Sequence, residues 1–320
     1  MKLGGSALAG TALLGLAGCG GGESGSGATE FTFSFGPDNS GSLQRIVDRF
    51  NQKFRDKYRV SYRVMSADTG QYFNQLKIEF QAGGGETDLI GGDVTWPVQF
   101  AANGWIADLS DRFTQEKQQE FLPAPVKSCT YDDKVYGVSW FTDAEMLYYR
   151  EDLLEKSGFS GPPETWSELK EQTHKVMQDA GMENGFVFQG ARYEGGVVNG
   201  LEYVWPSGGD VIDPDDPERV VIDSPGAVEG LAIERSMVED GVAPKAVSTY
   251  AEQECQAAFL NGRAVFCRNW PYMYALATGE RGSRLESAQV GVTPLPVAED
   301  QGRSFSGLVA LSGCRERELA

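Results

Sequence analysis

Histidine, basic residues and long apolar runs are all scarce in this sequence. His174 is the only histidine among 320 residues, which excludes a metal site built from several imidazoles. Lys and Arg number 28 against 46 for Asp and Glu, which gives a net charge of −18, and the sequence contains no basic run. Such a chain repels a phosphate backbone, so we expect no nucleic-acid partner. We also expect neither a metal nor a cofactor.

The longest apolar run lies at the N-terminus. Residues 3–18 carry no charge and follow Lys2, but they fall short of the roughly 20 apolar residues that a membrane-spanning helix needs. The pattern is typical of an export signal, and it ends in Leu16-Ala17-Gly18-Cys19, which resembles the bacterial lipobox. We therefore predict a lipoprotein signal peptide over 1–18, a Gly/Ser tether over 19–29, and anchoring outside the cytoplasm to the cell membrane through lipidated Cys19.

The other cysteines leave their pairing open. They form an even number in a chain predicted to be exported, which allows three disulfide pairings. None has the Cys-x-x-Cys spacing of a metal or redox motif. Both disulfides and free thiols fit the sequence at Cys129, Cys255, Cys267 and Cys314.

The globular part has the pattern of two α/β units, which suits a chain long enough for about two domains. Alternating Phe31, Phe33 and Phe35 predict a strand, and residues 30–90 continue as helix, strand, helix and strand. This order is typical of a parallel sheet covered by helices. A second set of elements begins near residue 135, with a capping box at 165–168 and a helix begun by Ser224 and Pro225.

Aromatic rings, short carboxylates and amides occur where loops follow the predicted strands. Open α/β sheets bind ligands at the carboxyl ends of their strands. Carboxylates accept hydrogen bonds from hydroxyls and rings pack on the C–H faces of a pyranose, so this set suits a neutral polyhydroxylated ligand. The ligand-binding candidates are Asp38, Asn39, Asp68, Asp93, Trp96, Phe141, Asp143, Trp205, Trp270 and Tyr272.

Several segments resemble the extracellular solute-binding proteins of ABC sugar importers, in the maltose- and trehalose-binding subgroup. In order along the chain they are residues 87–96, 100–109, 131–159, 162–169, 205–209, 259–275 and 290–296. The resemblance implies a two-lobe periplasmic-binding-protein clamp with hinge strands near 137–141 and 290–294 and a ligand cleft between the lobes. The first lobe would span 30–139 plus 295–320, and the second 140–294. Because family members continue further, we expect the second lobe to be incomplete at its C-terminal end.

The resemblance also implies a function and a distribution of the site. The protein would capture a carbohydrate, such as the α-glucosides trehalose or maltose, and deliver it to the membrane permease of an ABC importer. We expect a monomer without enzymatic activity. Two alternatives remain open, an exported glycoside hydrolase with paired carboxylates and a sugar sensor of the same fold. The matched contacts would be Asp93 and Trp96 from the first lobe, Phe141 and Asp143 from the hinge, and Trp205, Trp270 and Tyr272 from the second lobe.

Overall fold

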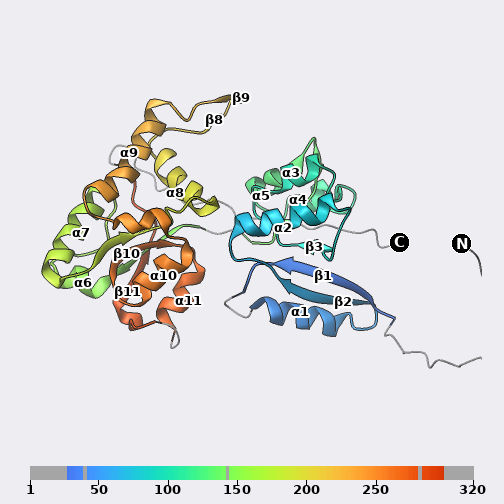
Figure 1. The fold of residues 1–320 in the computed structure, drawn as a ribbon, viewed down its shortest axis with the longest axis horizontal. Coiled ribbons are helices and arrows are strands. Elements are labelled where there is room, and N and C mark those ends of the chain that lie inside the picture. The colour runs from blue at the N-terminus through green and yellow to red at the C-terminus, as the bar shows by residue number, and fades with distance from the viewer. Residues whose placement is uncertain (1–26, 39–41, 142–143, 280–282, 299–320) are drawn as a thin grey trace, which may run out of the picture.

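The computed structural model describes residues 27–38, 42–141, 144–279 and 283–298. They form two α/β lobes, a first lobe containing β1 to β5 and a second lobe containing β6 to β11 (Figure 1). This architecture confirms the predicted two-lobe α/β class. Within the described ranges, no helix combines the length and the apolar character needed to cross a bilayer. Of the predicted site residues and cysteines, Cys19, Asn39, Asp143 and Cys314 lie outside the described residues, as do the signal-peptide residues 1–18.

The first lobe is built on a three-stranded parallel sheet in the order β2-β1-β3. Phe33 of the central strand is in register with Tyr62 on one side and Leu89 on the other. The chain alternates strand and helix as the sequence predicts, because apolar positions repeat every second residue in the strands and every third or fourth in the helices. The elements are β1 Thr29–Phe35, α1 Ser42–Lys53, β2 Tyr58–Val64, α2 Thr69–Gln81 and β3 Leu89–Ile90.

Three short helices and a small hairpin complete the first lobe. The hairpin turns at Asp132 and Asp133, whose φ angles of 49° and 59° match a two-residue turn with both central residues left-handed. Its residue Val135 packs with Leu109 and Phe113 in a small apolar cluster of its own. The elements are α3 Pro97–Ala102, α4 Gln115–Gln118, α5 Pro123–Ser128, β4 Thr130–Tyr131 and β5 Lys134–Val135.

The second lobe is built on a four-stranded mixed sheet in the order β11-β6-β10-β7. β10 is parallel to β7 and antiparallel to β6, and all six of its residues are buried. Helices cover this sheet, and the β8-β9 hairpin extends from the lobe (Figure 1). The strands are β6 Met146–Arg150, β7 Asn184–Val187, β8 Ile212–Asp213, β9 Asp216–Val220, β10 Ala264–Asn269 and β11 Val290–Thr293.

Two helices of the second lobe begin as the sequence predicts. Thr165 and Glu168 form the capping box of α7, with each side chain accepting a backbone N–H at 3.2 Å, and Gly181 ends the helix at a φ of 64°. Ser224 and Pro225 begin α9. The helices are α6 Glu151–Lys156, α7 Trp166–Ala180, α8 Glu194–Val204, α9 Pro225–Glu239, α10 Glu252–Leu260 and α11 Tyr272–Thr278, with 3-10 turns at Lys245–Thr249 and Ser287–Gln289.

The connection between the lobes differs from the expected pair of hinge strands. Residues 136–141 form no strand, because β5 already ends at Val135 and ring contacts made by Trp140 and Phe141 pack this segment against the first lobe. The second expected strand exists as β11, but it belongs to the sheet of the second lobe. Beyond it, Leu295 lies in the second-lobe core and Val297 bridges to Thr165. The division into lobes by residue number stays a prediction.

The described cysteines, Cys129, Cys255 and Cys267, are buried and form no disulfide with one another. Cys255 and Cys267 lie in the second-lobe core, and the Cys267 thiol donates to the carbonyl of Cys255 at 3.6 Å. Cys129 lies in the first lobe. Of the disulfide pairings that the sequence left open, those among these three residues are therefore absent.

Candidate functional site

A cavity of about 590 Å³ lies between the two lobes. Most of its residues come from loops and helices that follow the carboxyl ends of β1, β2 and β3 in the first lobe and of β7 and β10 in the second, and the others are Trp140, Phe141, Glu252 and Gln253. These strands are the parallel strands of each sheet, and ligands of α/β proteins bind at such ends. The position of the cavity therefore marks it as the candidate site.

The first-lobe wall of the cavity is a group of aromatic rings. Trp140 packs on Phe35 with 5.6 Å between ring centroids, and Phe141 meets both rings edge-on at 5.7 and 6.4 Å. Trp140 and Phe141 remain 42% and 41% exposed and lie against each other, so they form one continuous exposed apolar patch. The Phe35 ring lies directly on Gly91, where an added Cβ would come within 2.0 Å of it.

Two carboxylates of the first lobe lie beside these rings. The Asp93 Oδ1 accepts hydrogen bonds from the backbone N–H of Thr95 at 2.9 Å and from its hydroxyl at 2.6 Å. Asp38 accepts from the backbone N–H of Leu43 at 2.6 Å, at the start of α1. These bonds fix both carboxylates at the cavity edge, where a carboxylate accepts hydrogen bonds from hydroxyl groups.

Trp96 reaches the cavity from the core. It is only 6% exposed, and it meets the Tyr72 ring edge-on at 5.0 Å and the Phe100 ring at 5.9 Å. Both neighbours belong to the largest apolar cluster of the first lobe. Trp96 therefore contributes to the stability of the lobe as well as to the lining of the cavity.

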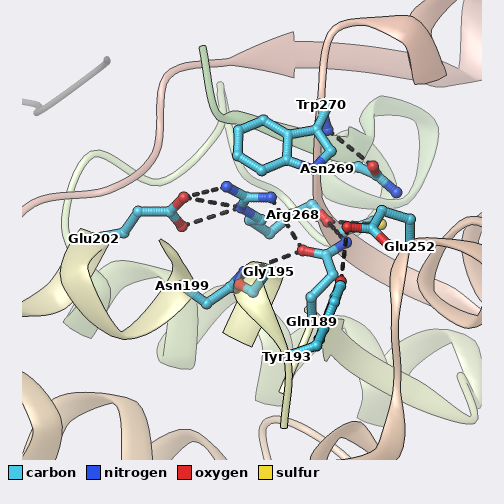
Figure 2. Close-up of polar contacts among 10 residues, drawn as sticks. Gln189, Tyr193, Gly195, Asn199, Glu202, Glu252, Arg268, Asn269 and Trp270 are labelled. Atoms are coloured by element: carbon cyan, nitrogen blue, oxygen red, sulfur yellow. Dashed lines mark hydrogen bonds and ion pairs between the residues drawn. The ribbon is translucent and has the colours of Figure 1, made fainter. Parts of the chain in front are cut away.

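The second-lobe wall includes two aromatic residues, Trp270 and Tyr272, and two carboxylates, Glu194 and Glu252. Trp270 follows β10 directly, and Tyr272 begins α11 two residues later. Glu194 begins α8, and Glu252 begins α10, where its Oε1 accepts the hydroxyl of Tyr193 at 2.7 Å. Figure 2 shows Trp270 lying over Arg268, with Glu252 and Tyr193 nearby.

The carboxyl group of Glu194, which lines the cavity, has a strongly raised pKa. Burial is the largest cause, and together with the negative charges of Asp93 and Glu252 it raises the pKa of Glu194 to about 8. Asp93 belongs to the opposite lobe. Asp93 of the first lobe and Glu194 of the second lobe thus line the same cavity, and the raised pKa favours a neutral Glu194 carboxyl group near neutral pH.

Residues 36–320 match the family model described as bacterial extracellular solute-binding protein. The chain belongs to this family. The match covers both lobes apart from β1.

This solute-binding protein is similar to a solved structure and to a curated protein at more than 30% identity. It is 38% identical to a structure described as maltose-bound T. maritima MalE3, with a TM-score of 0.80 over 89% of this chain and 72% of that chain. It is 35% identical to a probable ABC transporter-binding protein of Deinococcus radiodurans over 216 residues, 66% of this chain and 50% of that protein. The chain therefore spans about half the length of this curated relative.

A more distant structure shows the same fold. The GacH receptor of Streptomyces glaucescens superposes with a TM-score of 0.76 at 22% identity, over 90% of this chain and 71% of that chain. The two-lobe clamp expected from the sequence is thus the fold of this solute-binding protein.

The structure brings most of the predicted site residues to the cavity. Two do not line it. Asp68 caps α2, where its Oδ1 accepts the backbone N–H of Gln71 at 2.7 Å. The indole N–H of Trp205 donates to Asp210 at 3.0 Å. The roles of Asp68 and Trp205 as ligand contacts stay predictions, and so do those of Asn39 and Asp143. The predicted residues that line the cavity are Asp38, Asp93, Trp96, Phe141, Trp270 and Tyr272.

Sequence reasoning missed Phe35, Trp140, Glu194 and Glu252 among the lining residues. Glu194 follows β7, so the same rule that selected residues after strands would have found it once that strand was placed. The sequence pattern predicts Phe35 as a core residue of a strand, and it places Trp140 within the expected hinge strand over 137–141. Only the packing of rings shows that both face the cavity.

Proposed function

We propose that this solute-binding protein captures a carbohydrate outside the cytoplasm, with an α-glucoside such as maltose or trehalose as its ligand, and delivers it to the permease of an ABC importer. The observation that carries the proposal is the cavity between the lobes, whose two walls each combine aromatic rings with carboxylates. Rings pack on the C–H faces of a pyranose and carboxylates accept its hydroxyl protons. We propose a binding protein and not an enzyme.

The comparisons support this ligand class. The T. maritima structure with 38% identity was solved with maltose, and a relative of 35% identity is described as a probable ABC transporter-binding protein. Because the chain spans about half of that relative, the transport partner belongs to the proposal. So do the lipid anchor at Cys19 and the monomeric state.

The affinity that such a protein needs lies within reach of this cavity. A dissociation constant of about 1 μM corresponds to roughly 8 kcal/mol of net binding free energy. Charge-assisted hydrogen bonds contribute about 1.5–3 kcal/mol each. Two such bonds, to Asp93 and Asp38, would contribute about 3–6 kcal/mol, and stacking on Trp270 and Phe141 would contribute to the remainder.

Calorimetric titration of the purified protein tests the proposal. Maltose and trehalose are titrated separately, mannitol serves as an acyclic polyol, and free glucose is assayed in the same samples. We expect saturable binding of a disaccharide without glucose release. Glucose release would support the hydrolase alternative, and no binding of either disaccharide would contradict the proposed ligand class. Sugar uptake in cells with and without the protein separates transport from sensing.

A further inference from the structure

Arg268 is a fully buried cation that lies directly behind Trp270. Its side chain is 1% exposed, although it carries a charge in the middle of the second-lobe core. The guanidinium carbon is 3.8 Å from the centroid of the Trp270 ring, close enough for face-to-face cation–π contact. Figure 2 shows the indole ring lying over the guanidinium group. Arg268 therefore covers one face of the Trp270 ring, and Trp270 also lines the cavity.

The guanidinium plane is fixed by hydrogen bonds on its other sides. Its Nε donates to both carboxylate oxygens of Glu202, at 3.1 and 3.0 Å, and its Nη2 donates to the same group. Its Nη1 donates to the Gln189 side chain at 3.1 Å, and Gln189 in turn donates to the backbone carbonyl of Arg268 at 3.1 Å. Asn199 donates to the same oxygen of Gln189 at 3.2 Å. The orientation of the cation is thus set from α8 and from the end of β7.

The backbone of Trp270 is fixed as well. Its N–H donates to the side chain of Asn269 at 2.8 Å, and its carbonyl accepts the hydroxyl of Tyr148 at 2.9 Å. With the backbone held at two points, the remaining freedom of the residue lies in its two side-chain torsions. Contact with a flat, immobile guanidinium removes that freedom, because it selects one orientation of the indole ring.

The stability of the fold does not by itself explain the ion pair between Arg268 and Glu202. A buried pair loses the hydration of both charges, and its replacement by apolar residues of similar volume is often neutral or stabilising. A bound ligand, in contrast, gains affinity from a ring that is already in place. We propose that Arg268, oriented by Glu202, is a positioning residue that holds the Trp270 ring as the platform on which the sugar stacks. The inference rests on the proposed function for its ligand and deepens it.

The principal test is a double variant that removes both charges together, R268M/E202M. Its sites fill with apolar side chains of similar length, so we expect unfolding near the temperature of the parent protein. We expect its maltose affinity to fall at least about tenfold, since a loosely held ring must be ordered on binding. A matched control is R150M/D152M, which removes another ion pair of the second lobe, joined at 2.7 Å and away from the cavity. This control is expected to keep the parent affinity.

A ligand-free measurement keeps the proposal separate from the proposed function. Each protein is made with and without Trp270→Phe, and the difference in acrylamide quenching of fluorescence isolates the signal of Trp270. We expect this signal to become more accessible to acrylamide in R268M/E202M and to stay unchanged in R150M/D152M. If the parent binds neither disaccharide, the proposed function fails, and the quenching result still decides whether Arg268 positions Trp270.

A single conservative variant covers the case in which the double variant does not fold. R268K keeps the positive charge beside Glu202 but replaces the flat fork by a flexible amine, so we expect a folded protein in which Trp270 is quenched more readily and maltose binds more weakly. If R268M/E202M folds and shows the quenching and the affinity of the parent protein, the proposal is overturned. If R268M/E202M does not fold, the same result for R268K overturns it.

Discussion

The two walls of the cavity both present aromatic rings, but the rings are held in different ways. In the first lobe Phe35, Trp140 and Phe141 pack on one another at centroid distances of 5.6–6.4 Å. Phe35 ends β1, whereas Trp140 and Phe141 lie on a segment that forms no strand. In the second lobe Trp270 rests on a buried guanidinium group at the end of a fully buried strand. The first wall depends on side chains that remain half-exposed, whereas the second depends on the core.

This difference teaches where a substitution acts. A ring that is held by its exposed neighbours can be removed with a local effect, because the neighbours repack. The orientation of a ring that is held by a buried network depends on every residue of that network, so substitutions away from the cavity can change the site. The predictions below test this contrast between the walls.

The largest effect is expected at Trp96, which reaches the cavity but belongs to the core. Trp96→Ala leaves a void beside Tyr72 and Phe100, so we expect the free energy of unfolding to fall by about 3–5 kcal/mol. Urea unfolding followed by circular dichroism measures this loss. Trp140→Ala is the control, since its ring is 42% exposed and we expect a loss of only about 1 kcal/mol. Equal losses would remove the distinction between core and wall.

Ligand affinity separates the two walls next. We expect Trp270→Ala to weaken maltose binding at least about 30-fold, or about 2 kcal/mol, because it removes a pre-positioned aromatic platform. Trp140→Ala is expected to weaken binding only about threefold, since Phe35 and Phe141 still cover that wall. Calorimetry measures both. A larger loss for Trp140→Ala than for Trp270→Ala would reverse the proposed roles of the walls.

The first wall can also be disturbed without removing a ring. Gly91→Ala places a Cβ within 2.0 Å of the Phe35 ring, which must move, so we expect a loss of stability of about 1–2 kcal/mol. Gly161→Ala is the matched control, because no atom lies within 4 Å of its added Cβ. Thermal unfolding of the two variants compares them. Parent-like stability of Gly91→Ala would show that the Phe35 ring is loosely packed.

The smallest effect concerns pH. The pKa of Glu194 is raised to about 8 in the folded protein from its ordinary 4.5, so the folded state binds a proton that the unfolded state has lost. Stability should therefore fall as pH rises from about 4.5 to about 8, and the Glu194→Gln variant should show a smaller fall. Urea unfolding at several pH values measures the slope. Identical slopes for the variant and the parent would contradict this origin.

A second variant ties the pH effect to the facing walls. Asp93→Asn removes a charge of the first lobe that raises the pKa of Glu194, so it should also reduce the slope. Burial alone raises the pKa of Glu234 to about 7, and this residue does not line the cavity. The changes in the pH slope caused by Glu234→Gln and by Asp93→Asn should therefore add when the two substitutions are combined. The changes caused by Glu194→Gln and by Asp93→Asn should not add, because both act on the same carboxyl group.

Much of this fold follows from local patterns in the sequence. The alternating phenylalanines of β1, the capping box at Thr165 and the Ser224-Pro225 start of α9 act through neighbours in the chain, so they could be predicted. The same holds for the site residues that follow strands, such as Asp93 and Trp270. Each needs only the strand before it to be placed.

The rest depends on contacts between distant parts of the chain. Arg268 and Glu202 are 66 residues apart, and an arginine in a strand ordinarily indicates an exposed position. Only the tertiary structure shows that both are buried and that Trp270 covers the cation. The expected hinge strand over 137–141 is wrong for a similar reason, because ring packing rather than backbone pairing holds Trp140 and Phe141.

A crystal structure of the protein with maltose tests the central claim most directly, namely that the sugar lies between the lobes on a ring positioned by Arg268. The account predicts a glucose ring stacked on the face of Trp270 opposite the guanidinium group, with the indole in the orientation of the ligand-free protein and hydroxyls within hydrogen-bond distance of Asp93. A sugar bound outside the cavity, or a Trp270 ring turned away from Arg268 in the complex, would contradict it.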